Sequence, residues 1–341
     1  MVKKHILITG VSGTVGFEVL KQLIDKACYD ITVFDKKTKT SIRKLTPYQD
    51  KLKIVFGDIT DPKDFDEIKT PVDVVIHLAA IIPPLADDVP ELAQQVNTQG
   101  TKNLIEHLEQ HAPNAFFMYS SSISVYGDRV KTPYIKVTDP LVPSEGDAYA
   151  DTKIASEKRV QNCKLNWTIF RLAAIMGNHK VSKLMFHQPL NTALEIATPQ
   201  DTARAFVNGI EKQNLLSKRI FNLGGGETCR IGYAHFLERS FAIFGLGKLD
   251  FPHHAFADKN FHCGYYADWE DLNKIVHFRH HTLEDYFKTE RRKVSSFKKN
   301  MASLFRRPIK WYLLKQSEPY QAFKRNDITR INHFFNQNSK P

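Results

Sequence analysis

The feature that most constrains this chain is the alternation of short apolar runs with longer amphipathic stretches over the first half of the sequence. The apolar runs are near-continuous and have the length of strands that are covered on both faces. They are HILIT (5–9), ITVF (31–34), KIVF (53–56), VDVVIHL (72–78), FFMYS (116–120) and WTIFRL (167–172). Helical patterns lie between them, as at 17–27 and 90–112. This alternation predicts an α/β fold with a doubly wound parallel sheet.

Three glycines follow the first apolar run. Gly10, Gly13 and Gly16 have G-x-x-G-x-x-G spacing between the first predicted strand and the first predicted helix. Glycines permit a tight turn there, and the free N–H groups and dipole of the helix start suit a pyrophosphate. A glycine triplet alone is a weak signal, because glycines also cap ordinary turns. Its position between strand and helix supports dinucleotide binding.

The second predicted strand ends at Asp35, about 20 residues beyond the glycines, where a carboxylate can accept hydrogen bonds from the ribose hydroxyls of NAD. The same carboxylate would repel the 2′-phosphate of NADP. Lys36 and Lys37 follow directly and could offset that repulsion. We therefore expect NAD as the cofactor, with NADP as the alternative.

Tyr149 and Lys153 stand four residues apart in AYADTKIASEK (148–158), which makes them neighbours on one face of a helix. A free tyrosine, with a pKa near ~10, is a poor base at neutral pH. A lysine one turn away supplies a positive charge that stabilises the tyrosinate. The spacing alone also fits two side chains on a solvated helix face, so the rest of the chain must decide between the two interpretations.

Eight ordered stretches resemble the extended short-chain dehydrogenase/reductases, the NAD-dependent epimerase/dehydratase family. They are ITGVSGTVG (8–16), GDITD (57–61), HLAA (77–80), VNTQGTKNL (96–104), YSSSISVYGD (119–128), YADTK (149–153), FRLAAIMG (170–177) and FNLGGGE (221–227). Their number and order carry the resemblance more than any single match. It implies a Rossmann-type enzyme that transfers a hydride at a secondary alcohol or ketone.

The resemblance also implies roles for individual residues. The catalytic residues would be Ser122, Tyr149 and Lys153, with Ser121 in place of Ser122 if the alignment shifts. The cofactor would contact Gly10, Ser12, Gly13, Thr14, Val15, Gly16, Asp35, Lys36, Asp58, Ile59, Leu78, Ala79, Ala80, Asn97, Tyr149 and Lys153. The substrate would contact Ile81, Ile82, Ser122, Ala174, Met185, Phe186 and His187. No metal is expected.

The class of substrate is less constrained. Nucleotide-sugar epimerases of this family carry a diphosphate-binding Asn where Ala174 stands here, and the apolar loop 81–85 would suit an apolar substrate unless it packs on the protein itself. We expect an epimerase-like enzyme acting on a nucleotide sugar. The alternative is an NAD(P)-dependent dehydrogenase or reductase of a steroid- or lipid-like alcohol or ketone. A non-catalytic nucleotide-binding regulator is the third interpretation.

The net charge of +11 is concentrated at the C-terminal end. Residues 286–341 hold 14 of the 48 Lys and Arg and 3 of the 37 Asp and Glu, so the rest of the chain is balanced. Within 293–315, a helical pattern places Val294, Phe297, Met301, Leu304 and Phe305 on one face and basic residues around the other, and we expect Pro308 to end or kink the helix. The segment fits a helix packed on the protein or on a second subunit, or an anionic membrane surface; nucleic acid is not expected.

The expected organisation is a short-chain dehydrogenase/reductase domain over 1–287 and a basic extension over 288–341. The cofactor part would be mainly 1–177, and the substrate lobe mainly 178–200 and 225–287. The resemblance implies a homodimer through helices at 90–112 and 149–162. Four widely spaced cysteines, with no secretory signal and no apolar span, predict a reduced, cytoplasmic protein. Attachment to the inner face of a membrane is the alternative.

Overall fold

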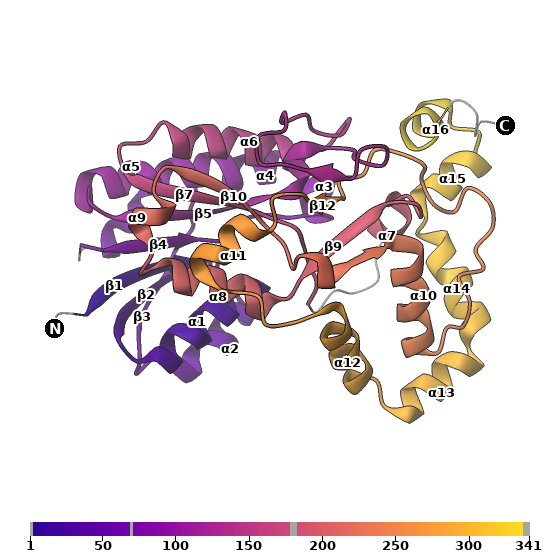
Figure 1. Cartoon of the computed structure of the whole chain (residues 1–341), viewed down its shortest axis with the longest axis horizontal. Coiled ribbons are helices and arrows are strands. Elements are labelled where there is room, and N and C mark those ends of the chain that lie inside the picture. The colour runs from indigo at the N-terminus through magenta and orange to yellow at the C-terminus, as the bar shows by residue number, and fades with distance from the viewer. Residues whose placement is uncertain (1–2, 69–70, 178–182, 337–341) are drawn as a thin grey trace.

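The computed structural model describes residues 3–68, 71–177 and 183–336. Within these ranges a seven-stranded parallel sheet has the order β10-β7-β5-β4-β1-β2-β3 (Figure 1). The strands are β1 (Lys4–Thr9), β2 (Tyr29–Asp35), β3 (Lys53–Phe56), β4 (Val74–His77), β5 (Phe116–Ser122), β7 (Asn166–Leu172) and β10 (Arg219–Leu223). The strand order changes direction between β1 and β4, which is where doubly wound sheets bind ligands. The predicted fold class is confirmed.

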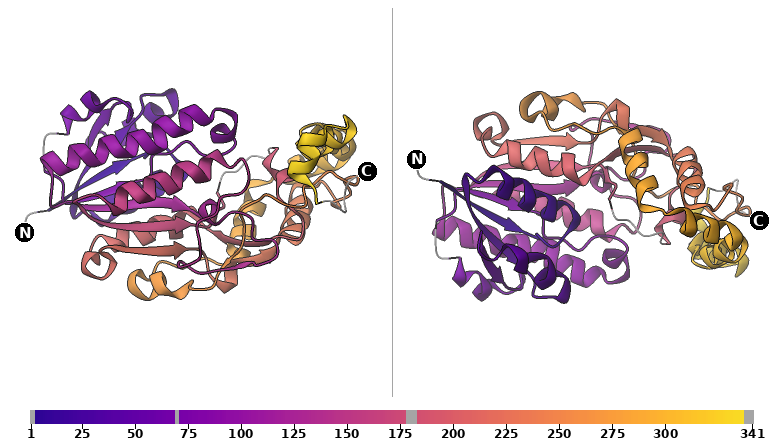
Figure 2. Two further views of the ribbon diagram at one scale, coloured as in Figure 1. Left: turned by 90° about the horizontal axis from the view of Figure 1, so that it is seen from above. Right: turned by 90° about the horizontal axis from the view of Figure 1, so that it is seen from below.

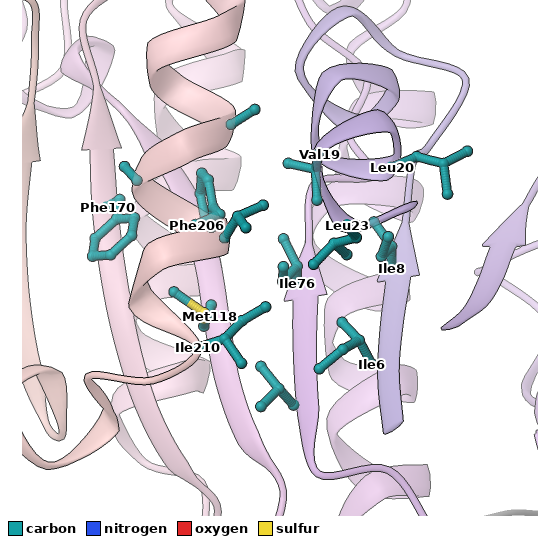
Figure 3. Packing of buried hydrophobic residues seen from close by; sticks show 14 of the residues in the cluster. Ile6, Ile8, Val19, Leu20, Leu23, Ile76, Met118, Phe170, Phe206 and Ile210 are labelled. Atoms are coloured by element: carbon teal, nitrogen blue, oxygen red, sulfur yellow. The ribbon is translucent and has the colours of Figure 1, made fainter. Parts of the chain in front are cut away.

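Helices cover both faces of this sheet. One face carries α1 (Thr14–Lys26), α8 (Pro199–Gly209) and α11 (Glu270–Val276), and the other carries α5 (Thr101–His111) and α6 (Ala148–Gln161). Ile6 and Ile8 of β1 face the first set, while Leu7 faces the second. Figure 3 shows Val19 and Leu23 of α1 and Phe206 of α8 on the first face. Burial on both faces explains why the strands read as continuous apolar runs.

The predicted helix over 90–112 is divided in the structure. It consists of α4 (Pro90–Ala93), a π-helical stretch (Gln94–Gly100) and α5. Such wide turns within helices are frequent at functional sites. Here the π-helical stretch carries Asn97, whose side chain is buried.

A smaller lobe, called the substrate lobe after the role predicted for it, lies at the carboxyl ends of the strands (Figure 1). It contains β8 (Ala174–Ile175), β9 (Ala193–Ala197) and β11 (Arg230–Gly232), with β12 (Tyr265–Tyr266) paired to β6 (Tyr134–Ile135). Its helices are α7 (Leu184–His187), α10 (Tyr233–Phe244) and α12 (Leu283–Lys293). A separate apolar cluster, including Phe186, Ile196 and Phe236, forms the core of this lobe.

Up to residue 336, where the described part of the chain ends, the C-terminal extension forms four helices along the substrate lobe. They are α13 (Ser296–Leu304), α14 (Arg306–Lys315), α15 (Glu318–Lys324) and α16 (Ile328–Phe334), and they lie far from the N-terminus in both views of Figure 2. Leu313 joins the core of the lobe, and Ala322, Ile331, Phe334 and Phe335 cover Ala257. Within the described residues, no helix is long and apolar enough to span a bilayer.

The position of the break in the tail differs from the prediction. The first helix ends before Phe305, and Pro308 lies in the first turn of α14. The first turn of a helix tolerates proline, because its N–H groups have no partner inside the helix. Pro308 therefore follows the break that it was expected to cause.

A buried ion pair joins the sheet to α6. Arg171 of β7 donates to both carboxylate oxygens of Glu157, with Nη2 to Oε2 at 2.7 Å, and the two side chains are 4% and 1% exposed. We expect Glu157→Gln to lower the free energy of unfolding by about 3 kcal/mol, because a buried charge loses its partner. Urea denaturation would measure this. Glu106→Gln, from the half-exposed pair with Arg159, is the control, with an expected change below about 0.5 kcal/mol. Equal losses would contradict this estimate.

Candidate active site

The three predicted catalytic residues come together at the carboxyl edge of the sheet. Ser122 is the last residue of β5, while Tyr149 and Lys153 occupy the first two turns of α6. Asp147 caps α6, since its Oδ1 accepts a hydrogen bond from the N–H of Ala150 at 2.9 Å. The cap fixes where the helix begins and hence which side chains face the end of β5.

Lys153 is held in a buried position by groups from β5. Its Nζ donates to the carbonyl of Ser120 at 2.8 Å and to the hydroxyl of Tyr119 at 3.3 Å. The same Nζ lies 5.9 Å from the centre of the Tyr149 ring. Burial lowers the pKa of Lys153 to about 7, and the nearby charge of Glu157 opposes that shift. Burial of this ammonium therefore costs free energy, and a negative charge beside it would offset part of that cost.

Tyr149 is buried next to Ser122. Burial raises the pKa of the Tyr149 phenol above its usual value, while a hydrogen bond with the Ser122 side chain acts in the opposite direction. Ile81 of the loop after β4 packs in the same small apolar cluster as Tyr149. A phenol in this environment needs positive charge beside it before it can act as a base.

Close backbone contacts require glycine at two positions of the loop between β1 and α1. Gly10 has φ of +72°, and a Cβ there would lie 2.6 Å from the backbone nitrogen of Ala79. A Cβ on Gly16 would lie 2.3 Å from the carbonyl oxygen of Gly10. The start of α1, at Thr14 and Val15, has no hydrogen bond from a capping side chain. Such a helix start keeps N–H groups available for an anion, which suits the pyrophosphate of a dinucleotide.

Asp35 is tied to the glycine loop. Its Oδ2 accepts the N–H of Ser12 at 2.5 Å and its Oδ1 accepts the N–H of Lys36 at 2.8 Å. Burial raises the pKa of Asp35, and the hydrogen bonds from Ser12 oppose this. The Lys36 ammonium turns to Asp58 at 2.8 Å, and its hydrogen bond lowers the pKa of Asp58 to about 2. Lys36 is thus engaged by a carboxylate.

Asn97 is connected to the loop after β4 and to α6. Its Nδ2 donates to the carbonyl of Ile81 at 2.9 Å and to Oγ1 of Thr152 at 3.0 Å, and its Oδ1 accepts the N–H of Ile81 at 2.7 Å. Both amide hydrogens are therefore used by protein atoms. The Asn97 side chain thus positions the loop that contains Leu78, Ala79 and Ala80. The sequence analysis expected Asn97 itself to contact the cofactor directly.

Two of the predicted substrate contacts are core residues. Phe186 is 1% exposed and packs against Phe251 and Phe256, while Met185 is 8% exposed in the same cluster. Both side chains contribute to the interior of the substrate lobe, and their contact with a substrate stays a prediction. Part of that predicted lobe, 178–182, lies outside the described residues.

The remaining predicted contacts lie in different environments. Ala174 is half-buried on β8, and Ile82 is 56% exposed. His187 pairs with Glu318 of α15 at 3.1 Å between Nε2 and Oε2, and its ring contacts Phe334. His187 thus joins the substrate lobe to the C-terminal extension.

Sequence reasoning missed the contacts of Lys153 with Tyr119 and Ser120. Both residues lie in the YSSS stretch that was used for the resemblance, but only the packing of α6 against β5 brings them to Lys153. His262 was missed as well: its Nδ1 lies 2.8 Å from the Asp147 carboxylate that caps α6. No local pattern identifies a residue that lies over 100 positions away in the chain. Within the described ranges, no three His, Cys, Asp or Glu side chains are grouped to hold a metal ion.

Comparison with known proteins identifies the family. A sequence model described as the NAD dependent epimerase/dehydratase family matches residues 6–224, from β1 to the glycines after β10. The chain belongs to this family. The match covers the sheet from Ile6 of β1 onward and each of the three proposed catalytic residues, and the expected resemblance is confirmed.

Individual relatives of this epimerase/dehydratase protein cover only part of it. It is 31% identical over 161 residues to 3-beta-hydroxysteroid dehydrogenase of Mycolicibacterium neoaurum, spanning 46% of this chain and 42% of the relative. It is 32% identical over 164 residues to dTDP-glucose 4,6-dehydratase of Mycolicibacterium smegmatis, spanning 46% and 48%. The matched stretches thus span less than half of each relative.

Solved structures match this family member over most of its length. UDP-glucuronic acid 4-epimerase from Bacillus cereus, solved with UDP-glucuronic acid and NAD, has a TM-score of 0.67 at 20% identity and covers 87% of this chain and 99% of its own. DesIV, a dTDP-glucose 4,6-dehydratase from Streptomyces venezuelae, has a TM-score of 0.70 at 20% identity, with coverage of 84% and 96%. Likeness at this identity establishes the fold.

The position of Asp35 leads to a prediction about cofactor choice. We expect Asp35→Ser to weaken NAD binding about tenfold and to strengthen NADP binding, because an acceptor for the ribose and a repulsive charge are both lost. Titration of the protein with each nucleotide would measure this. Asp50→Ser, which removes an exposed carboxylate outside the predicted cofactor contacts, is the charge-matched control. An unchanged preference in Asp35→Ser would show that this carboxylate does not discriminate.

Proposed function

We propose that this protein uses NAD to transfer a hydride at a secondary alcohol or ketone carbon of a nucleotide sugar, in the manner of an epimerase. The observation that carries the proposal is the buried Lys153 beside Tyr149 and Ser122, at the sheet edge that also holds the glycine loop. The tight loop at Gly10 and the uncapped start of α1 fit a pyrophosphate. A small-molecule substrate is implied.

The roles of the three side chains follow from their chemistry. Tyr149 would take the proton from the substrate hydroxyl as the C–H bond breaks, and would return it when the alcohol forms again with inverted configuration. Lys153 would stabilise the tyrosinate by its charge. Ser122 would hold the substrate oxygen by a hydrogen bond. When bound, oxidised NAD supplies the hydride acceptor and a positive charge that favours the tyrosinate.

A net dehydrogenase or reductase of an apolar, steroid- or lipid-like alcohol or ketone is the second candidate. Ile81 packs against Tyr149, and Ile82 and Leu85 of the same loop are 56% and 46% exposed. Apolar side chains beside a catalytic phenol suit an apolar substrate. Ala174 stands where the nucleotide-sugar enzymes carry Asn. A non-catalytic regulator is disfavoured by the complete set of Ser122, Tyr149 and Lys153.

Release of bound nucleotide separates the first two candidates. An epimerase must keep its cofactor through an internal oxidation and reduction, so protein purified without added nucleotide should release nearly one NAD per chain on denaturation. A net dehydrogenase should release little and should bind NAD or NADP reversibly on titration. If the protein released no nucleotide on denaturation and also bound none on titration, the cofactor proposal itself would be contradicted.

For assembly and location we propose a cytoplasmic homodimer that forms through residues 90–112, which comprise α4, the π-helical stretch and α5, and through residues 149–162 of α6 and its C-cap. A surface groove runs between these helices and is lined by Gln99, Lys102, Ala155 and Arg159. Sedimentation velocity of the purified protein would test the dimer. Location at the inner face of a membrane would be an addition to this assembly, made by a different surface.

A further inference from the structure

Two helices of the C-terminal extension present large apolar side chains to solvent. Six such residues between 297 and 312 are exposed: Phe297 (73%), Met301 (39%), Leu304 (73%), Phe305 (48%), Trp311 (59%) and Tyr312 (61%). Single exposed apolar residues are common on soluble proteins, but six within two adjoining helices are a patch of the kind that marks an interaction site. We call these six residues and the basic residues around them the α13–α14 surface.

The basic residues of this surface have no acidic neighbours in sequence. From Arg291 to Gln316 the chain contains nine Lys and Arg and no Asp or Glu. Lys298, Lys299, Arg306 and Arg307 are exposed, and none of the four lies within 4.0 Å of a carboxylate in the part of the chain that the structure describes. Their charge is therefore available to an anionic partner.

The opposite side of α14 packs on the substrate lobe, where Leu313 is buried and Ile309 and Leu314 are partly buried against the same apolar cluster. α13 has no buried residue and contacts that cluster through the partly buried Ala302. The patch is thus presented by two adjoining helices, of which α14 is anchored in the lobe. A helix with one face on the protein and a basic, aromatic face toward solvent has the composition of an interfacial helix.

Trp311 gives the patch a further interfacial property. The Nζ of Lys315 lies 3.5 Å from the centre of the Trp311 ring. This arrangement combines an amphipathic ring with a cation one helical turn away. Tryptophan and tyrosine concentrate at the level of lipid headgroups, where one end of the ring is apolar and the other is hydrated.

We propose that the α13–α14 surface binds the headgroup region of an anionic phospholipid bilayer. Phe297, Leu304 and Trp311 would enter the boundary between headgroups and acyl chains. Lys298, Lys299, Arg306 and Arg307 would pair with lipid phosphates. Membrane attachment through this surface does not depend on the reaction proposed for Ser122, Tyr149 and Lys153, so the two proposals can be tested separately.

Vesicle co-sedimentation of the full chain tests the proposal. We expect binding to vesicles of phosphatidylcholine with about one third phosphatidylglycerol, and little binding to pure phosphatidylcholine. Binding should fall as salt rises past about 0.1 M, where the screening length is about 10 Å. The full chain is required, because removal of residues 288–341 would expose Ala257 and the core around Phe236.

Paired variants separate the apolar and the charged contributions. Phe297→Ser with Leu304→Ser should lower vesicle affinity at least tenfold, since two large apolar groups lose their contact with the acyl boundary. Val142→Ser with Leu215→Ser, at positions 62% and 46% exposed elsewhere, is the matched control. Lys298→Glu with Lys299→Glu should lower affinity about a hundredfold. Lys164→Glu with Lys212→Glu, which are exposed and change the net charge equally, should alter it less than about threefold.

Three results would overturn the proposal. The first is equal binding to neutral and anionic vesicles, or equal losses in the target and control variants. The second is self-association that Leu304→Ser abolishes in the absence of vesicle binding, which would assign the surface to a second copy of the chain. The third is that the protein binds duplex DNA or RNA but no vesicles, and that Phe297→Ser with Leu304→Ser leaves the nucleic-acid affinity unchanged.

Discussion

Replacing Tyr149 with Phe is expected to lower kcat by about three orders of magnitude and to leave NAD affinity within about twofold. General acid–base catalysis by a positioned side chain contributes about 10²–10⁴ in rate. The ring of Tyr149 packs with Ala86, Ala93 and Ile81, and Phe keeps those contacts. The variant therefore loses the hydroxyl and little else.

The measurement is steady-state turnover with the substrate found for the wild type, together with a nucleotide titration. Tyr119→Phe is the matched control, because it removes the other phenol near Lys153. Burial raises the pKa of Tyr119 above its usual value, and its hydroxyl lies within the fully buried part of β5. Turnover in this control should stay within about tenfold of the wild type. If Tyr119→Phe were as inactive as Tyr149→Phe, the assignment of Tyr149 as the single acid/base would be contradicted.

Replacing Lys153 with Met is expected to lower turnover by about three orders of magnitude while changing how stability depends on pH. The pKa of Lys153 is about 7 in the folded protein, against an ordinary value of 10.5. Between these values the unfolded chain holds more protons than the folded one, so the free energy of unfolding rises with pH. Below pH 7 both states hold the proton, and the burial penalty is fully present.

The difference between wild type and Lys153→Met isolates this effect. From pH 7 to 10 the wild type should gain up to about 1.4 kcal/mol per pH unit relative to the variant. Urea denaturation at several pH values measures it. For Lys158→Met, on the exposed side of α6, the curve of unfolding free energy against pH should remain parallel to that of the wild type throughout. If the curve of unfolding free energy against pH for Lys153→Met is also parallel to the wild type, titration of Lys153 does not cause the rise in stability with pH.

Much of the fold could be predicted because its strands are covered on both faces. Ile6 and Leu7 are adjacent in sequence and lie in two different cores, so apolar residues run without a break along β1. The glycine loop could also be predicted, because Gly10 and Gly16 lie between an apolar run and a helical pattern, where a tight turn is needed. Both signals are local in the chain, and local signals can be found in a single sequence.

The parts of the site that depend on long-range packing could not be predicted. Met185 and Phe186 were expected in the pocket, but an apolar run in a short lobe can face either a ligand or the interior. Asn97 lies in a motif, yet its partners Ile81 and Thr152 become visible only when the loop after β4 and α6 meet. The amphipathic tail likewise contains apolar residues on both sides, and only packing shows that Leu313 is buried while Leu304 is exposed.

The position of the C-terminal extension also affects the order in which the parts of the chain can fold during synthesis. Every strand of the large sheet lies between Lys4 and Leu223, so the cofactor half contains all its pairing partners once that stretch has left the ribosome. The substrate lobe has a different dependence, because Ala257 is covered by Ala322, Ile331 and Phe334. Domains fold as units while synthesis proceeds from the N-terminus. A ribosome that stalls between Leu223 and Ala322 would therefore carry seven paired strands beside a lobe that the last helices do not yet cover. Such an intermediate exposes apolar surface to chaperones.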